Sequence, residues 1–135
     1  MPNTINSGWK RLLAITWLVW VTLWTVGLLR PETLVVRDAV IPSEFAFWAS
    51  KSLHVVGYLA LTLWPAWHFG RPHWLLVVLA SVAHGMATEA IQPFCGRHGS
   101  ILDVGWDSMG IAAGLLLGQS LNGINSKNGQ PGERS

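Results

Sequence analysis

The residues best suited to chemistry gather in two short stretches of an otherwise apolar chain. Lys51, His54 and Tyr58 recur at i, i+3 and i+7, which places them on one face of a helix. Ionisable groups are costly to bury in apolar surroundings, and where such a chain lies in a membrane they usually indicate a functional site. We therefore expect this stripe to form one binding site with a second polar set downstream: Glu89, Gln92, Arg97, Asp103 and Asp107.

These side chains could carry out three kinds of chemistry. Lys51 and Arg97 could hold an anionic group such as a phosphate or a carboxylate. His54 could form an acid–base pair with Glu89 or Asp103, which makes these three the candidate catalytic residues. A histidine with two or three carboxylates could instead hold a divalent metal ion. The sequence contains no nucleophile elbow, phosphate-binding glycine loop or HExxH motif that would assign a reaction.

One other pair has the spacing of metal ligands, Cys95 and His98. Structural zinc needs about four ligands, and no second pair lies nearby in the sequence. We therefore expect neither a resident metal nor a cofactor. Cys95 is the single cysteine of the chain, so an internal disulfide is excluded.

Composition points to a small membrane protein. Of the 135 residues, 50% are hydrophobic and 12% are charged, against about 25% charged residues in soluble domains. The net charge of +2 comes from scattered residues, and no basic run suggests nucleic acid as a partner. The lipid bilayer is therefore the first expected partner.

The apolar runs predict an all-α bundle of four transmembrane helices over about residues 12–29, 45–69, 73–92 and 101–121. The first has 18 uncharged residues, which span about 27 Å as a helix and nearly match the hydrocarbon thickness of about 30 Å. A cleaved signal peptide is the alternative for this run, but no small-x-small cleavage site follows it. Pro65 is expected to kink or shorten the second helix.

The predicted domain organisation is a tail over residues 1–11, the four-helix domain over 12–121, and a disordered tail over 122–135. With the N-terminus in the cytoplasm, the inner segments hold more basic residues than the outer ones, as the positive-inside rule requires. Five positions are inner, namely Lys10, Arg11, Arg71, Lys127 and Arg134, and three are outer, namely Arg30, Arg37 and Arg97.

Alternating helix directions bring all the polar positions to one side of the bilayer. Lys51 and His54 lie near the start of the second helix, Glu89 lies near the end of the third, and Asp103 opens the fourth. Asp103, Asp107, Gly110 and Gly114 share one stripe, where the glycines allow close helix contact. We expect Lys51 to pair with Glu89 or Asp103, and Arg97 to pair with a carboxylate. His84 is expected deeper in the bundle, as a satisfied core histidine.

The order and spacing of these motifs resemble the VanZ-like family of small bacterial membrane proteins. The resemblance covers about residues 46–118 and includes Lys51-x-x-His54-x-x-x-Tyr58, Glu89-x-x-Gln92, Arg97, Asp103, Gly110 and Gly114. Two positions depart from the family pattern. Ser50 stands where the family often has Asp, and Asp107 stands where it often has Asn.

The resemblance implies a multi-pass protein of the bacterial plasma membrane that acts at the cell envelope. The family's best-known member is associated with resistance to the glycopeptide teicoplanin. The first functional hypothesis is a pocket facing the extracytoplasmic side that binds or modifies an envelope or lipid-linked anionic molecule. The second is a structural or partner-binding subunit whose ionic network only fixes helix packing. Proton-coupled transport is a third, and it would require a homo-oligomer, because four helices are few for alternating access.

Overall fold

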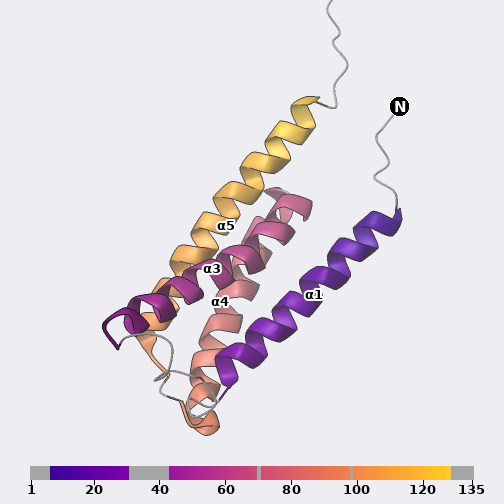
Figure 1. Ribbon diagram of the computed structural model, residues 1–135. Helices are drawn as coiled ribbons and strands as arrows, with labels where there is room; N and C mark the ends of the chain where they lie inside the picture. Colours follow the sequence, from indigo (N-terminus) through magenta and orange to yellow (C-terminus); the bar gives the residue numbers. More distant parts are fainter. Residues whose placement is uncertain (1–6, 31–42, 70, 98, 129–135) are drawn as a thin grey trace, which may run out of the picture.

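The computed structural model describes residues 7–30, 43–69, 71–97 and 99–128, and within them every long element is an α-helix (Figure 1). The four long helices are α1 (Ser7–Leu29), α3 (Ser43–Phe69), α4 (Trp74–Ile91) and α5 (Ile101–Asn128). Two short 3-10 helices, η2 (Arg71–His73) and η3 (Gln92–Cys95), flank α4. The predicted all-α bundle of four long helices is confirmed.

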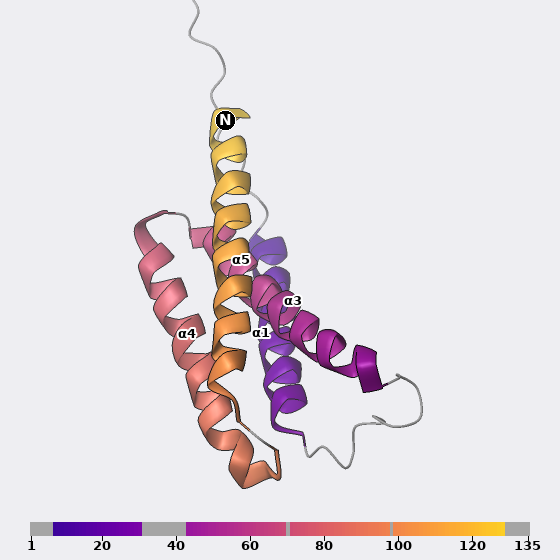
Figure 2. The same ribbon diagram turned by 90° about the vertical axis from the view of Figure 1, so that its left-hand side faces the viewer.

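Three of these segments are long and apolar enough to cross a membrane: Arg11–Leu29, Arg71–Cys95 and Ile101–Ile124. The second of the four predicted spans, α3, is not among them: it has the length, at 27 residues, but it is less apolar because it carries Lys51, His54 and other polar side chains. It also runs obliquely to the other three helices (Figure 2).

The exterior of the bundle is apolar and its interior is partly polar, the reverse of a soluble protein. Large side chains such as Leu18, Leu76 and Leu116 are exposed, at 57%, 66% and 66%. The buried residues include ionisable and other polar side chains, among them His54, Glu89, Asp103 and Asp107. An apolar outer surface around buried polar groups is the arrangement expected of a membrane protein.

Helices α3 and α5 form the most extensive contact in the bundle, and glycines allow it. A Cβ at Gly114 would lie 2.6 Å from the carbonyl oxygen of Leu59, and one at Gly118 would lie 2.8 Å from that of Leu63. A Cβ at Gly110 would overlap the carbonyl oxygen of Val55. The predicted glycine stripe is therefore the face of α5 that packs against α3.

Pro65 does not shorten α3, which continues to Phe69. Proline has no N–H, so the carbonyl of Leu61 four residues earlier loses its helical donor. The indole Nε1–H of Trp17 in α1 donates to that carbonyl oxygen at 2.9 Å and replaces the missing bond. Trp17 therefore has a specific hydrogen-bonding role at this point of α3.

The end of α5 also differs from expectation. The predicted tail was to begin at residue 122, but the helix continues to Asn128. The side chain of Asn122 donates to the carbonyl oxygen of Trp67 at 2.9 Å and ties this extension to the end of α3.

Candidate functional site

Five ionisable side chains from three helices meet at one end of the bundle. Lys51 and His54 come from α3, Glu89 from α4, and Asp103 and Asp107 from α5. We call these five residues the rim cluster. Neighbouring helices run in opposite directions, so the start of α3, the end of α4 and the start of α5 share one end (Figure 1). The predicted convergence of these positions is therefore what the structure shows.

His54 is the centre of the rim cluster and is 3% exposed. Its Nδ1 lies 2.7 Å from Asp107 Oδ1, and its Nε2 lies 3.9 Å from Asp103 Oδ2. An ionised carboxylate can only accept a hydrogen bond, so with Asp107 ionised the Nδ1–H of His54 donates to Asp107 Oδ1. In the neutral ring, Nε2 then presents its lone pair towards Asp103.

Lys51 lies at the outer edge of the rim cluster. Its ammonium group contacts Asp103 Oδ1, and the side chains of the two residues are 15% and 11% exposed. Of the two partners expected for Lys51, Asp103 is the one that the structure shows. This pair is the part of the cluster nearest to solvent, whereas Asp107, at 1% exposed, is the deepest.

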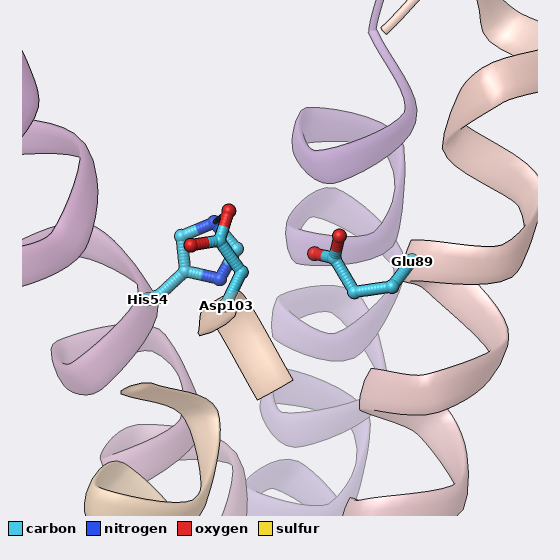
Figure 3. A group of neighbouring side chains, drawn as sticks. All are labelled: His54, Glu89 and Asp103. Atoms are coloured by element: carbon cyan, nitrogen blue, oxygen red, sulfur yellow. Dashed lines mark ion pairs between the residues drawn. The ribbon is translucent and has the colours of Figure 1, made fainter. Parts of the chain in front are cut away.

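Glu89 faces His54 and Asp103 from the opposite side (Figure 3). One ligand atom from each of these three residues lies within 4.8 Å of the others. The Glu89 carboxylate is held by the backbone N–H of Ser100 at 2.7 Å and by Gln92 Nε2 at 3.2 Å. Gln92 therefore supports the cluster through Glu89.

The turn after α4 brings the backbone N–H of Ser100 to the Glu89 carboxylate. Gly96 adopts a left-handed conformation with φ of 74°, which glycine reaches at no steric cost. A Cβ at Gly99 would overlap the backbone carbonyl oxygen of Glu89. The backbone therefore passes close enough to α4 for Ser100 to reach the Glu89 carboxylate.

Tyr58 belongs to a second polar layer. Its hydroxyl lies 2.9 Å from His84 Nδ1 and 3.4 Å from Thr88 Oγ1. On the other side of the ring, His84 Nε2 lies 2.9 Å from Thr25 Oγ1 in α1. The Thr25 hydroxyl also contacts its own helix at the Val21 carbonyl, 2.7 Å away.

These contacts give His84 a partner on each ring nitrogen, as expected of a satisfied core histidine. Sequence reasoning did not identify Thr25 or Thr88. Helical threonines commonly bond to their own backbone, so no pattern in the sequence distinguishes one that also reaches another helix.

Arg97 was expected to pair with a carboxylate, but the partners that the described part of the chain gives it are backbone carbonyl oxygens. Its Nη1 donates to the carbonyl oxygens of Gly27 and Leu28, at 3.4 and 2.9 Å. The last carbonyls of a helix have no intrahelical donor and carry partial negative charge, so a cation is a suitable cap there. Arg97 therefore caps α1. The sequence did not indicate this role, because the position of a residue in a short loop does not determine the direction of its long side chain.

The other pair with metal-ligand spacing is only partly visible. Cys95 is a free, half-buried thiol at the end of η3. His98 lies outside the described residues.

The geometry of the rim cluster suits proton transfer or cation binding at His54. A carboxylate on Nδ1 fixes the ring orientation and supports either a base or a ligand at Nε2. The chain matches no protein-family model, no curated protein and no solved structure.

Proposed function

We propose that this chain is a VanZ-like protein of the bacterial plasma membrane whose rim cluster binds or modifies an anionic, lipid-linked or other envelope molecule. The proposal places the N-terminus in the cytoplasm and the rim cluster near the extracytoplasmic surface. It includes a phenotype, resistance to teicoplanin, which the family resemblance implies.

One observation carries the proposal. The rim cluster collects three carboxylates, a lysine and a histidine from three helices in the interior of an otherwise apolar bundle. Each such group costs about 2.5–3.5 kcal/mol on insertion scales at the membrane centre, and less near an interface. A chain that needed only helix packing could use apolar residues at these positions.

Within the cluster, His54 is best placed for chemistry, because Asp107 holds its ring and its Nε2 faces Asp103 and Glu89. Lys51 is the cluster's anion-binding group. An anionic ligand arriving from the rim would compete with Asp103 for Lys51, at the most exposed edge of the site.

The alternative is a structural subunit whose ionic network only fixes the helix register. It is favoured by one observation: the cluster's side chains already contact one another or the nearby backbone. A network of this kind can hold the helices together without a ligand.

The two functions are separated by measuring teicoplanin susceptibility and membrane abundance together. Host cells would express the wild type, Glu89→Gln or His54→Gln, with Arg71→Gln as a matched change at the opposite end. A working site predicts that the two cluster variants lose resistance at unchanged abundance, while Arg71→Gln keeps it. Loss of abundance in step with resistance would support the structural alternative, and a wild type without resistance would reject the proposed function.

A further inference from the structure

We propose that the rim cluster is a binding site for a divalent transition-metal ion of the Zn²⁺ type, with His54 Nε2, Asp103 Oδ2 and Glu89 as ligands. The inference concerns the same site as the proposed function and rests on it for biological purpose. It goes against the sequence-based expectation that no metal is bound. Imidazole nitrogen with carboxylate oxygen is a donor set that zinc and its neighbours accept.

The spacing of the three donors suits an ion between them. The ligand atoms of His54, Glu89 and Asp103 all lie within 4.8 Å of one another. Ligands about 2.1 Å from a tetrahedral ion are about 3.4 Å apart, so the donors would move inwards by about 1 Å. The Glu89 carboxylate points towards the side where the Asp103 carboxylate and the His54 ring lie together (Figure 3).

Each proposed ligand is held by a further group, as ligands in metal sites usually are. Asp107 accepts from His54 Nδ1, which directs the Nε2 lone pair towards Asp103. Lys51 contacts the Oδ1 atom of Asp103 and leaves Oδ2 on the side of His54. Glu89 is oriented by Ser100 N and by Gln92 Nε2.

Charge balance also favours a cation. The cluster sets three carboxyl groups, those of Glu89, Asp103 and Asp107, against the ammonium group of Lys51 and the imidazole of His54. Arg97 does not compensate, because it contacts the end of α1. A divalent ion would offset the negative charge of these carboxyl groups in a low-dielectric interior, where unpaired charges are most costly.

An unpartnered oxygen beside the cluster is an independent observation. Gln92 is 1% exposed and touches Glu89 through Nε2, yet its Oε1 has no hydrogen-bond partner among the described residues. Buried polar atoms without a partner are uncommon and costly. A metal-bound water beside Glu89 would supply the missing donor to this oxygen.

The test is metal binding by the full chain purified in detergent and stripped with EDTA. Zn²⁺ uptake would be measured by elemental mass spectrometry, and Co²⁺ by its visible absorption. We expect about one ion per chain in the wild type and in Cys95→Ser, which removes the thiol of the other candidate pair. His54→Ala and Asp103→Asn should abolish binding, and the outer-sphere change Asp107→Asn should weaken it about 10–100-fold. His68→Ala, an exposed histidine at the opposite end of α3, should bind like the wild type.

Three outcomes would overturn the metal site: no uptake by a monodisperse wild type, uptake abolished by Cys95→Ser, or uptake unchanged in both His54→Ala and Asp103→Asn. The wild-type measurement does not depend on any variant folding. A wild type that confers teicoplanin resistance without binding metal rejects this inference alone. One that binds metal without conferring resistance supports the metal site and rejects the proposed function.

Discussion

Asp103 lies next to both Lys51 and His54, and this position determines how the rim cluster responds to substitution. Its Oδ1 atom contacts Lys51, and its Oδ2 atom faces His54 Nε2 at 3.9 Å. Removing one member of a buried ion pair leaves the other charge uncompensated, whereas removing both can be nearly neutral. The ion pair between Lys51 and Asp103 should therefore show strong coupling.

For this pair we predict that Lys51→Met lowers the free energy of unfolding by about 2–4 kcal/mol, because Asp103 keeps its charge without a partner. The double variant Lys51→Met/Asp103→Asn should recover most of that loss. Thermal or SDS unfolding of the purified protein measures both. Arg71→Met, an exposed cation at the other end, is the control and should change stability little. Additive losses in the double variant would contradict the prediction.

Residue patterns predicted the membership of the cluster better than its pairings. Helical spacing and alternating directions were enough to bring together Lys51, His54 and Asp103. They could not show that Tyr58 points to His84, or that Arg97 reaches α1, because these contacts depend on rotamers and on a loop path. The possible hydrogen-bond partners of these side chains lie only a few ångströms apart, and a periodic sequence pattern does not distinguish among them.

At the scale of helices, the bond from Trp17 to the Leu61 carbonyl explains how α3 accommodates Pro65. Backbone groups inside a bilayer cannot hydrogen-bond to water, so a carbonyl that has lost its helical donor needs a donor from another helix. The sequence contains both residues, but only the packing of α1 against α3 shows that they serve the same carbonyl.

We predict that Trp17→Phe costs more stability in the native chain than in a Pro65→Ala background. Alanine restores the N–H to Leu61, so the indole donor is no longer needed there. Any change in the stacking of residue 17 on Trp64, whose centroid lies 5.5 Å from that of Trp17, is the same in both backgrounds and cancels in the comparison. The coupling should be about 1 kcal/mol by unfolding of the four variants. Equal costs in both backgrounds would exclude this role for Trp17.

The glycine stripe of α5 gives a second prediction at this scale. Gly114→Ala should destabilise the bundle by about 1–3 kcal/mol, because its Cβ would meet the rigid backbone of α3 at Leu59. Gly105→Ala is the matched control on the same helix. Nothing lies within 4 Å of a Cβ at that position, so the substitution should be neutral or slightly stabilising. Melting temperatures in detergent compare the two, and equal shifts would contradict the packing role of Gly114.

At the scale of the whole molecule, antiparallel connections determine which segments share a membrane surface. The start of α1, η2 and the end of α5 lie at one end of the bundle, and the rim cluster lies at the other (Figure 1). The number, order and direction of the helices were predictable because long apolar runs, separated in the sequence by proline or glycine residues such as Pro31, Gly70 and Pro93, are strong signals. The oblique path of α3 was not, since crossing angles follow from packing details such as the glycine stripe.

The remaining question at this scale is which end faces outward, and the single cysteine can answer it. Cys95 ends η3, on the side of the rim cluster, and is partly exposed. If basic residues set the orientation as expected, this thiol is extracytoplasmic. A membrane-impermeant maleimide should therefore label the wild type in intact cells.

A Cys95→Ser/His68→Cys variant carries its thiol at the opposite end and should be labelled only after the membrane is opened. The reverse pattern would place the rim cluster at the cytoplasmic surface. A molecule confined to the outer envelope could not then reach Lys51 and His54, so the proposed teicoplanin phenotype would lose its physical basis. The metal site would be unaffected, because its ligands are defined within the bundle and not by the side they face.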